Sequence, residues 1–253
     1  MTGRPRPRRW LAAPLAAVLA VPACAAGGGP EEVMVLAASS LTEVFDQIGA
    51  DFAAENQSYA VRFAYAGSSV LAAQARNGAP ADVIALASAA SLAPILDETT
   101  PESRGVTFAR NQLVIAVPEG NPARVTRLAD LGRPGTRVAL CAEQVPCGAL
   151  AVRALAAGRV IVRPVTLEQD VKAALSKVAF GEADAALVYR TDAAAAADRV
   201  DAVEFAEASD AVTDYPIAVL RGAPHAAGAR VFVDFVLSES GRQRLRAAGF
   251  GLP

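Results

Sequence analysis

Short apolar runs alternate with segments of helical periodicity along most of this chain. The runs are bounded by turn residues, as strands usually are, and between them apolar residues recur three and four positions apart. We expect strands near 33–38, 60–66, 82–87, 111–117, 137–141, 160–165, 184–189, 202–205 and 215–221. We expect helices near 40–55, 69–76, 90–97, 126–131, 147–157, 168–180, 191–197 and 226–248. This alternation predicts an α/β fold with mostly parallel sheets.

Two apolar runs, 112–117 and 215–221, are not tied to a neighbouring helix. We interpret them as paired crossover strands between two lobes, because the stretch between them carries its own strand–helix alternation and is long enough for a lobe. Lobe 1 would comprise 31–113 plus 218–253, and lobe 2 would comprise 114–217. A ligand in such an arrangement lies in the cleft, at the carboxyl ends of the strands.

The amino terminus predicts export. Four arginines precede an apolar run that ends at Ala23, a pattern typical of a signal peptide over 1–23 and too short for a permanent membrane span. Val21-Pro22-Ala23-Cys24 resembles the lipobox of bacterial lipoproteins, so we expect lipidation of Cys24 and a lipid anchor at the outer face of the cell membrane. A plain cleavage site, giving a secreted or periplasmic protein, is the alternative. Residues 24–30 read as a flexible tether.

The charge balance limits the kind of partner. The formal net charge is −2 for the whole chain, and the part after the arginine-rich leader is more negative still. Such a balance argues against nucleic acid as a partner. An anion site in this protein must therefore work through local donors rather than through a general positive field.

Two cysteines, Cys141 and Cys147, remain besides Cys24. Thiols of an exported protein tend to oxidise, so a short-loop disulfide between them is the favoured interpretation. Two free buried thiols are the alternative. A metal site is less favoured, because two thiols without a neighbouring histidine or acidic cluster fall short of a closed zinc site.

Serine pairs follow two of the apolar runs, at Ser39-Ser40 and Ser68-Ser69, and a helical segment follows each pair. The first turn of a helix has unpaired N–H groups and a partial positive charge, so a hydroxyl beside it completes a set of donors for an anion. The plain alternative is helix capping, since Ser40 and Glu43 alone form a capping box.

The second lobe offers similar junctions. Pro146 predicts a helix start that leaves the N–H of Cys147 pointing outward. A further start near Val171 follows Glu168 and Asp170, although these acids also fit plain capping. Tyr189 ends an apolar run, where an aromatic residue more often belongs to the core than to a site.

Several of these segments, in order and with the right separations, resemble the molybdate-binding receptors of bacterial ABC importers. They are Ala37–Thr42, Ser68-Ser69 with Asn77–Asp82, Val145–Gly148, Asp170–Lys172 and Val188-Tyr189. The resemblance implies the type II periplasmic-binding-protein fold, whose two lobes close on a tetrahedral oxyanion. It implies ligand contacts from the hydroxyl and N–H of Ser40 and Ser68, the N–H of Cys147 and Val171, and the phenol of Tyr189. Permease and ATPase subunits of an importer are implied as partners of a monomer.

Molybdate and tungstate at neutral pH accept hydrogen bonds at every oxygen and donate none, so a pocket of donors suits them. Molybdenum would enter only as molybdate, without a resident cofactor, and the protein would not be an enzyme. Cys147 departs from the family pattern, where a small residue such as alanine is usual, and a bond to Cys141 would pin its loop. The alternatives are a sulfate or phosphate receptor, with Glu168 or Asp170 as the acceptor that phosphate prefers. A serine hydrolase is disfavoured, because Gly67-Ser68-Ser69 lacks the nucleophile-elbow pattern and the lone His225 has no evident orienting acid.

Overall fold

The computed structural model describes residues 2, 29–100 and 105–253. The predicted signal peptide, the lipidation site Cys24 and most of the tether lie outside these residues. Within the described part, no helix is long and apolar enough to cross a membrane.

The elements follow the alternation expected from the sequence. The strands are β1 Glu31–Ala38, β2 Tyr59–Ala66, β3 Val83–Ala85, β4 Val106–Pro118, β5 Val138–Cys141, β6 Thr166–Glu168, β7 Ala185–Tyr189, β8 Val200–Val203 and β9 Val212–Val219. The α-helices are α1 Thr42–Glu55, α2 Ser68–Arg76, α3 Ala89–Leu92, α4 Pro146–Ala157, α5 Val171–Ala179, α6 Arg190–Ala195, α7 Ala226–Leu237 and α8 Glu239–Ala247. Short 3₁₀ turns are η1 Ser39–Leu41, η2 Ala93–Glu98, η4 Leu128–Gly132 and η5 Ala206–Asp210.

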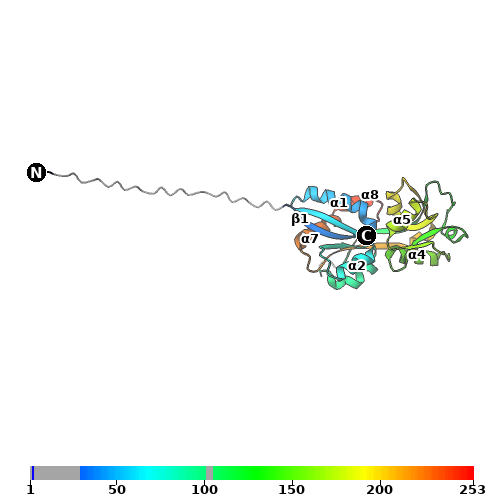
Figure 1. The fold of residues 1–253 in the computed structure, drawn as a ribbon, viewed down its shortest axis with the longest axis horizontal. Coiled ribbons are helices and arrows are strands. Elements are labelled where there is room, and N and C mark those ends of the chain that lie inside the picture. Colours follow the sequence, from blue (N-terminus) through cyan, green and yellow to red (C-terminus); the bar gives the residue numbers. More distant parts are fainter. Residues whose placement is uncertain (1, 3–28, 101–104) are drawn as a thin grey trace.

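The first lobe is built on strands in the order β2-β1-β3-β9-β4. Strand β1 is parallel to β2 and β3, whereas β9 is antiparallel to β3 and β4. Alternate residues of β1 face opposite sides, so Val33 and Val35 pack with Phe45 of α1 and Phe232 of α7. Leu36 packs on the other side with Leu71 of α2. Helices therefore cover both faces of this sheet (Figure 1).

The second lobe continues from β4 through β7 and β5 to the edge strand β6, and β8 also pairs with β4. Strands β5, β6 and β7 are parallel, while β7 and β8 run antiparallel to β4. Helices α4 and α5 lie in this lobe, to the right in Figure 1. The fold is thus the two-lobed type II arrangement with mixed rather than mostly parallel sheets.

Strand β4 belongs to both lobes. Its residues Val106–Gln112 pair with β9, and from Leu113 on it pairs with β7 and β8. Strands β4 and β9 therefore form a crossover pair. The part of β4 that pairs with β9 ends at Gln112, where the predicted 112–117 run begins. Strand β9 pairs with β3 and β4 from Val212 on, so the predicted return to lobe 1 after residue 217 falls inside this strand. The detailed lobe boundaries stay a prediction.

Several predicted elements are wrong in detail. The helix expected near 126–131 is the 3₁₀ turn η4, and the helix expected near 90–97 is the short α3 followed by η2. The strand expected near 160–165 is an unpaired extended segment, and β6 begins only at Thr166. Pro164 has no N–H to donate, and Ile161 is 85% exposed, so the segment reaches β5 only where the Val165 N–H bonds to the Val138 carbonyl at 2.9 Å. The helix expected over 226–248 is broken at Ser238, whose hydroxyl accepts from the Gly241 N–H at 3.3 Å and caps α8.

Candidate anion-binding site

A small pocket, with a cavity volume of about 10 Å³, lies between the two lobes. All five residues singled out from the sequence line it: Ser40, Ser68, Cys147, Val171 and Tyr189. Each of the five is at most 4% exposed. The structure therefore brings together groups from widely separated parts of the chain, while their role as ligand contacts stays a prediction.

Four helical starts meet at this pocket. Ser40 lies in η1, Ser68 begins α2, Cys147 is the second residue of α4 and Val171 begins α5. The backbone N–H groups of these four residues lie where a helix has no preceding carbonyl to bond. Within the described ranges, none of these four N–H groups has a hydrogen-bond partner. They are available to an acceptor in the pocket.

The hydroxyl of Ser68 is oriented by a backbone contact. Its oxygen accepts from the Ala87 N–H at 3.0 Å. A hydroxyl that already accepts from the protein keeps its own hydrogen to donate. Ser68 can therefore offer both its N–H and its O–H to the pocket.

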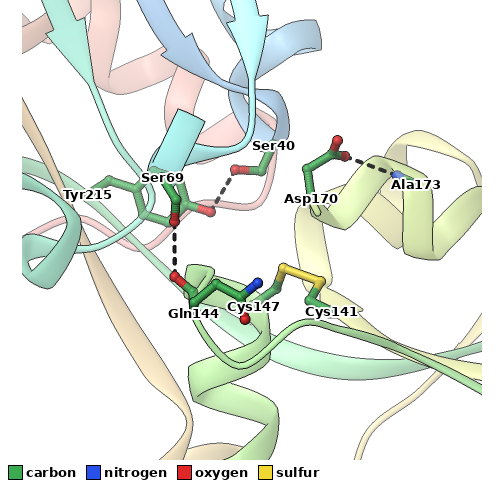
Figure 2. The surroundings of a disulfide bond; sticks show 8 residues. All are labelled: Ser40, Ser69, Cys141, Gln144, Cys147, Asp170, Ala173 and Tyr215. Atoms are coloured by element: carbon green, nitrogen blue, oxygen red, sulfur yellow. Dashed lines mark hydrogen bonds between the residues drawn. A yellow bond between two sulfur atoms is a disulfide. The ribbon is translucent and has the colours of Figure 1, made fainter. Parts of the chain in front are cut away.

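A second chain of hydrogen bonds ends at Ser40, and the sequence did not reveal it. The Tyr215 hydroxyl lies 2.9 Å from Ser40 Oγ, as drawn in Figure 2, and the Asn111 amide donates to that hydroxyl at 3.5 Å. Asn111 also donates to Thr191 Oγ1 at 2.8 Å. When Tyr215 accepts from Asn111 and donates to Ser40, the Ser40 hydrogen is left for the pocket. Tyr215 and Asn111 thus support the site.

The phenol of Tyr189 has no hydrogen-bond partner in the described part of the chain, although its oxygen is fully buried. A buried polar group without a partner is costly, so such a group indicates a missing ligand or water. Burial, with the nearby Tyr215 and Asp192, raises the pKa of Tyr189 well above its usual value. The phenol therefore keeps its proton and can donate.

The residues lining the pocket include no lysine or arginine and one acid, Asp170. Its carboxylate accepts from the Ala173 N–H at 3.0 Å and caps α5, as Figure 2 shows. Glu168 accepts from the Thr166 hydroxyl at 2.7 Å. Each of the two acids proposed as phosphate acceptors therefore has one bond within the protein, and only Asp170 of the two lines the pocket.

The lobes touch on two sides of the pocket. Ser69 of α2 donates to the Gln144 carbonyl at 2.9 Å, across the gap seen in Figure 2. Lys172 of α5 lies 2.6 Å from Glu43 of α1. In addition, Gly67 lies so close to lobe 2 that a Cβ there would be 2.5 Å from the Gln169 carbonyl oxygen. The structure is a closed form.

Asp192 of α6 is a charged group that the sequence reading missed. Its carboxyl oxygens are buried without a hydrogen bond in the described chain, and Lys172 lies 3.3 Å from one of them. Burial raises the pKa of Asp192 to about 7, against the lowering effect of Lys172. Asp192 also contributes to the raised pKa values of Tyr189 and Tyr215, so it lies close to the phenols at the pocket.

Cys141 and Cys147 form a disulfide with their Cα atoms 5.7 Å apart. Among the described residues, no group of three or more His, Cys, Asp or Glu side chains could hold a metal ion. His225, the lone histidine, does have an acid beside it: Asp82 accepts from its backbone N–H at 2.7 Å and lies 3.3 Å from Nδ1. Neither residue lines the pocket with Ser40 and Ser68.

A family model described as bacterial extracellular solute-binding protein matches residues 33–251. The molybdate-binding protein ModA of Mycobacterium tuberculosis H37Rv is 41% identical over 225 residues, which cover 89% of this chain and 86% of that protein. The periplasmic molybdate-binding protein of Azotobacter vinelandii has a similar fold, with a TM-score of 0.75 at 21% identity over 87% of this chain and 99% of that one. The sulfate-binding protein SubI of M. tuberculosis H37Rv also reaches 0.75, at 20% identity over 87% of this chain and 86% of that one.

Proposed function

Because the chain belongs to the bacterial extracellular solute-binding proteins and to the molybdate-binding proteins among them, we propose that it binds molybdate, and tungstate, for delivery to an ABC importer. Members of an extracellular family act outside the cytoplasm, and this protein is an exported one. The permease and ATPase subunits of the importer are its proposed partners. Acylation of Cys24 would hold the binding domain at the outer face of the membrane.

The set of hydrogen-bond donors in the pocket carries this proposal. Free N–H groups at four helical starts, two serine hydroxyls and the unpartnered Tyr189 phenol face one space, and the lining contains no cationic side chain. A fully deprotonated tetrahedral dianion accepts at every oxygen, so these donors match it. About six charge-assisted hydrogen bonds of roughly 1.5 to 3 kcal/mol each give a gross stabilisation on the order of 10 kcal/mol. After the costs of ordering and closure, micromolar or tighter binding is expected.

Thermal unfolding in the presence of molybdate, tungstate, sulfate or phosphate tests the ligand class. Because a ligand that binds only the folded state raises the unfolding temperature, we expect upward shifts with molybdate and tungstate. Sulfate presents the same acceptors on a smaller tetrahedron, and phosphate retains a proton in part, so we expect smaller shifts with both. Larger shifts with either of these than with molybdate would contradict the proposed ligand.

Titration calorimetry of three variants then tests the site. Ser40→Ala and Ser68→Ala each remove one donor, and we expect molybdate affinity to fall about tenfold or more in each. Arg76→Ala is the control, since Arg76 ends α2, away from its amino-terminal donors. The site assignment fails if Arg76→Ala weakens binding more than the two serine variants do.

A further inference from the structure

The disulfide joins two elements that meet at the pocket. Cys141 is the last residue of β5, and Cys147 lies in the first turn of α4, only six positions later. Both cysteines are 3% exposed. The bond therefore closes the short segment Ala142–Pro146 into a ring that connects the strand end to the helix start.

This closed segment carries several of the contacts that build the site. Cys147 offers a free backbone N–H, and Val145, Pro146 and Cys147 all line the pocket. The Gln144 carbonyl accepts from the Ser69 hydroxyl of the opposite lobe at 2.9 Å. In Figure 2 the disulfide lies beside the Cys147 backbone, and Ser40 and Ser69 lie across from it in the opposite lobe.

Other restraints on the segment hold its ends more than its middle. The Ala142 N–H bonds to the Glu168 carbonyl at 2.8 Å, and the Val145 N–H bonds to the Ala142 carbonyl at 3.0 Å. The N-cap residue of α4, Val145, provides no side-chain cap for the helix start. Gly148 packs so tightly on Ala142 that a Cβ would collide with the Ala142 carbonyl. Packing therefore brings helix and strand together, and the disulfide is the covalent link that fixes their spacing.

We propose that the Cys141–Cys147 disulfide is a positioning group for the anion site: it holds the Cys147 N–H in its donating place and the Gln144 carbonyl in reach of Ser69. This inference rests on the proposed function. Because no sulfur atom needs to touch the ligand, the bond acts through the backbone. A donor fixed in advance loses less entropy when ligand arrives, so the bond raises affinity by preorganisation.

The test compares wild-type protein with Cys141→Ala/Cys147→Ala by calorimetry and by stopped-flow measurement of molybdate dissociation. Alanine keeps the backbone N–H at 147, and the substitutions remove the link with its two buried sulfur atoms. We expect the double variant to bind molybdate about tenfold more weakly, chiefly through faster dissociation. Binding within twofold of wild type would overturn the inference.

If the disulfide had only a structural role, its loss would lower the unfolding temperature and leave the affinity of the folded protein unchanged. Val200→Ala is the matched control, because Val200 is a buried core residue of β8 in the same lobe and does not line the pocket. We expect this control to unfold at a lower temperature and to bind molybdate like wild type. A control weakened as much as the double variant would show that affinity follows stability alone, against the inference.

Reduction of folded wild-type protein gives a second measurement if the double variant does not fold. A phosphine reduces the bond to two thiols and is itself oxidised to the phosphine oxide, and it is removed without oxygen before titration. We expect the same loss of affinity, and an unchanged affinity in protein that has gained two free thiols per chain would contradict the proposal. If the oxidised wild-type protein binds none of the oxyanions, the proposed function itself fails. If it binds molybdate equally well with and without the disulfide, only the present inference fails.

Discussion

Single residues decide which way the hydrogens point in this pocket. Ser40 and Ser68 were predicted from their place after strands, and both line the pocket. Tyr215, Asn111 and Asp192 were missed, because nothing in the neighbouring sequence shows that these side chains are buried or which distant residues they contact. Such partners come from other parts of the chain, and neither periodicity nor a local motif records them.

The hydroxyl of Tyr215 offers a test at this scale. Tyr215→Phe removes the group that lies 2.9 Å from Ser40 Oγ, so the Ser40 hydroxyl is no longer oriented as a donor. We expect molybdate affinity to fall about threefold to tenfold, the usual range for one neutral hydrogen bond. The control is Tyr65→Phe, because the Tyr65 hydroxyl donates to Asp46 and does not line the pocket. Calorimetry that shows equal losses of affinity in both variants would contradict a role for the Tyr215 hydroxyl in orienting Ser40.

The carboxyl of Asp192 predicts a pH dependence of stability. Its pKa of about 7 in the folded state lies above the value of 3.8 for an unperturbed group. The folded state therefore binds the Asp192 proton more tightly than the unfolded chain does. The resulting contribution to the free energy of unfolding is fully present below pH 3.8 and is lost as pH rises toward 7. As pH rises across that window, we expect the free energy of unfolding to decrease by up to about 1.4 kcal/mol per pH unit because of this residue. Denaturant unfolding of Asp192→Asn should show a shallower dependence on pH.

The same carboxyl also predicts how binding varies with pH. A dianion beside Tyr189 adds negative charge near Asp192, so the protonated form of Asp192 is favoured in the complex. Lys172, Glu43 and Asp170 are the other charged groups that act on Asp192. We expect molybdate affinity to fall by up to about tenfold per pH unit above neutrality. Calorimetry should find little such dependence in Asp192→Asn, and an unchanged slope would contradict this role.

Helix starts are the elements that make the site. The sequence predicted each of them from a strand followed by a serine, a proline or an acid, and these signals are local. It failed where strand pairing decides the outcome. Residues 160–165 have the composition of a strand, but they meet a neighbouring strand only at Val165, whose N–H bonds to the Val138 carbonyl. It also failed at Ser238, where one capping hydroxyl divides a long amphipathic segment into α7 and α8.

The contact between the starts of α2 and α5 predicts a glycine requirement. Gly67 precedes α2 with an ordinary φ of −61°, so alanine fits its backbone without strain. In the closed form, however, the added methyl would lie 2.5 Å from the Gln169 carbonyl oxygen. We expect Gly67→Ala to weaken molybdate binding by about tenfold or more, since closure is hindered.

The stability of the ligand-free protein is the control for that variant. A methyl group that clashes only when the lobes meet should leave unfolding of the open form nearly unchanged. Loss of affinity with unchanged ligand-free stability supports the closure argument. A large fall in stability without ligand would instead show that Gly67 is required by the fold of lobe 1 itself.

The whole molecule consists of two lobes that both contribute hydrogen-bond donors to the pocket and that share strand β4. The sequence predicted two lobes and a crossover pair, because long-range alternation and the uncoupled apolar runs are visible in it. It did not predict that β4 would run unbroken from Val106 to Pro118, since Arg110, Asn111 and Gln112 interrupt its apolar pattern. These three residues themselves pair with β9, and β4 pairs with β7 from Leu113 on, so the polar stretch stays within the strand.

Solution scattering tests the behaviour of the molecule as a unit. Donors come from both lobes, and Lys172–Glu43 and Ser69–Gln144 join the lobes only when they meet. We expect the radius of gyration of the protein to decrease when molybdate is added and to remain larger in Gly67→Ala. No compaction of the wild-type protein at saturating molybdate would contradict ligand-driven closure.

The shared strand also governs what happens over many rounds of capture and release. Because β4 carries hydrogen bonds of both sheets, we expect the two lobes to rotate about this strand while its pairing in each lobe keeps their register. Each time the cargo leaves, the two sets of donors are still facing one another. The next anion therefore meets two lobes whose donors are already aligned, so that binding requires only their closure.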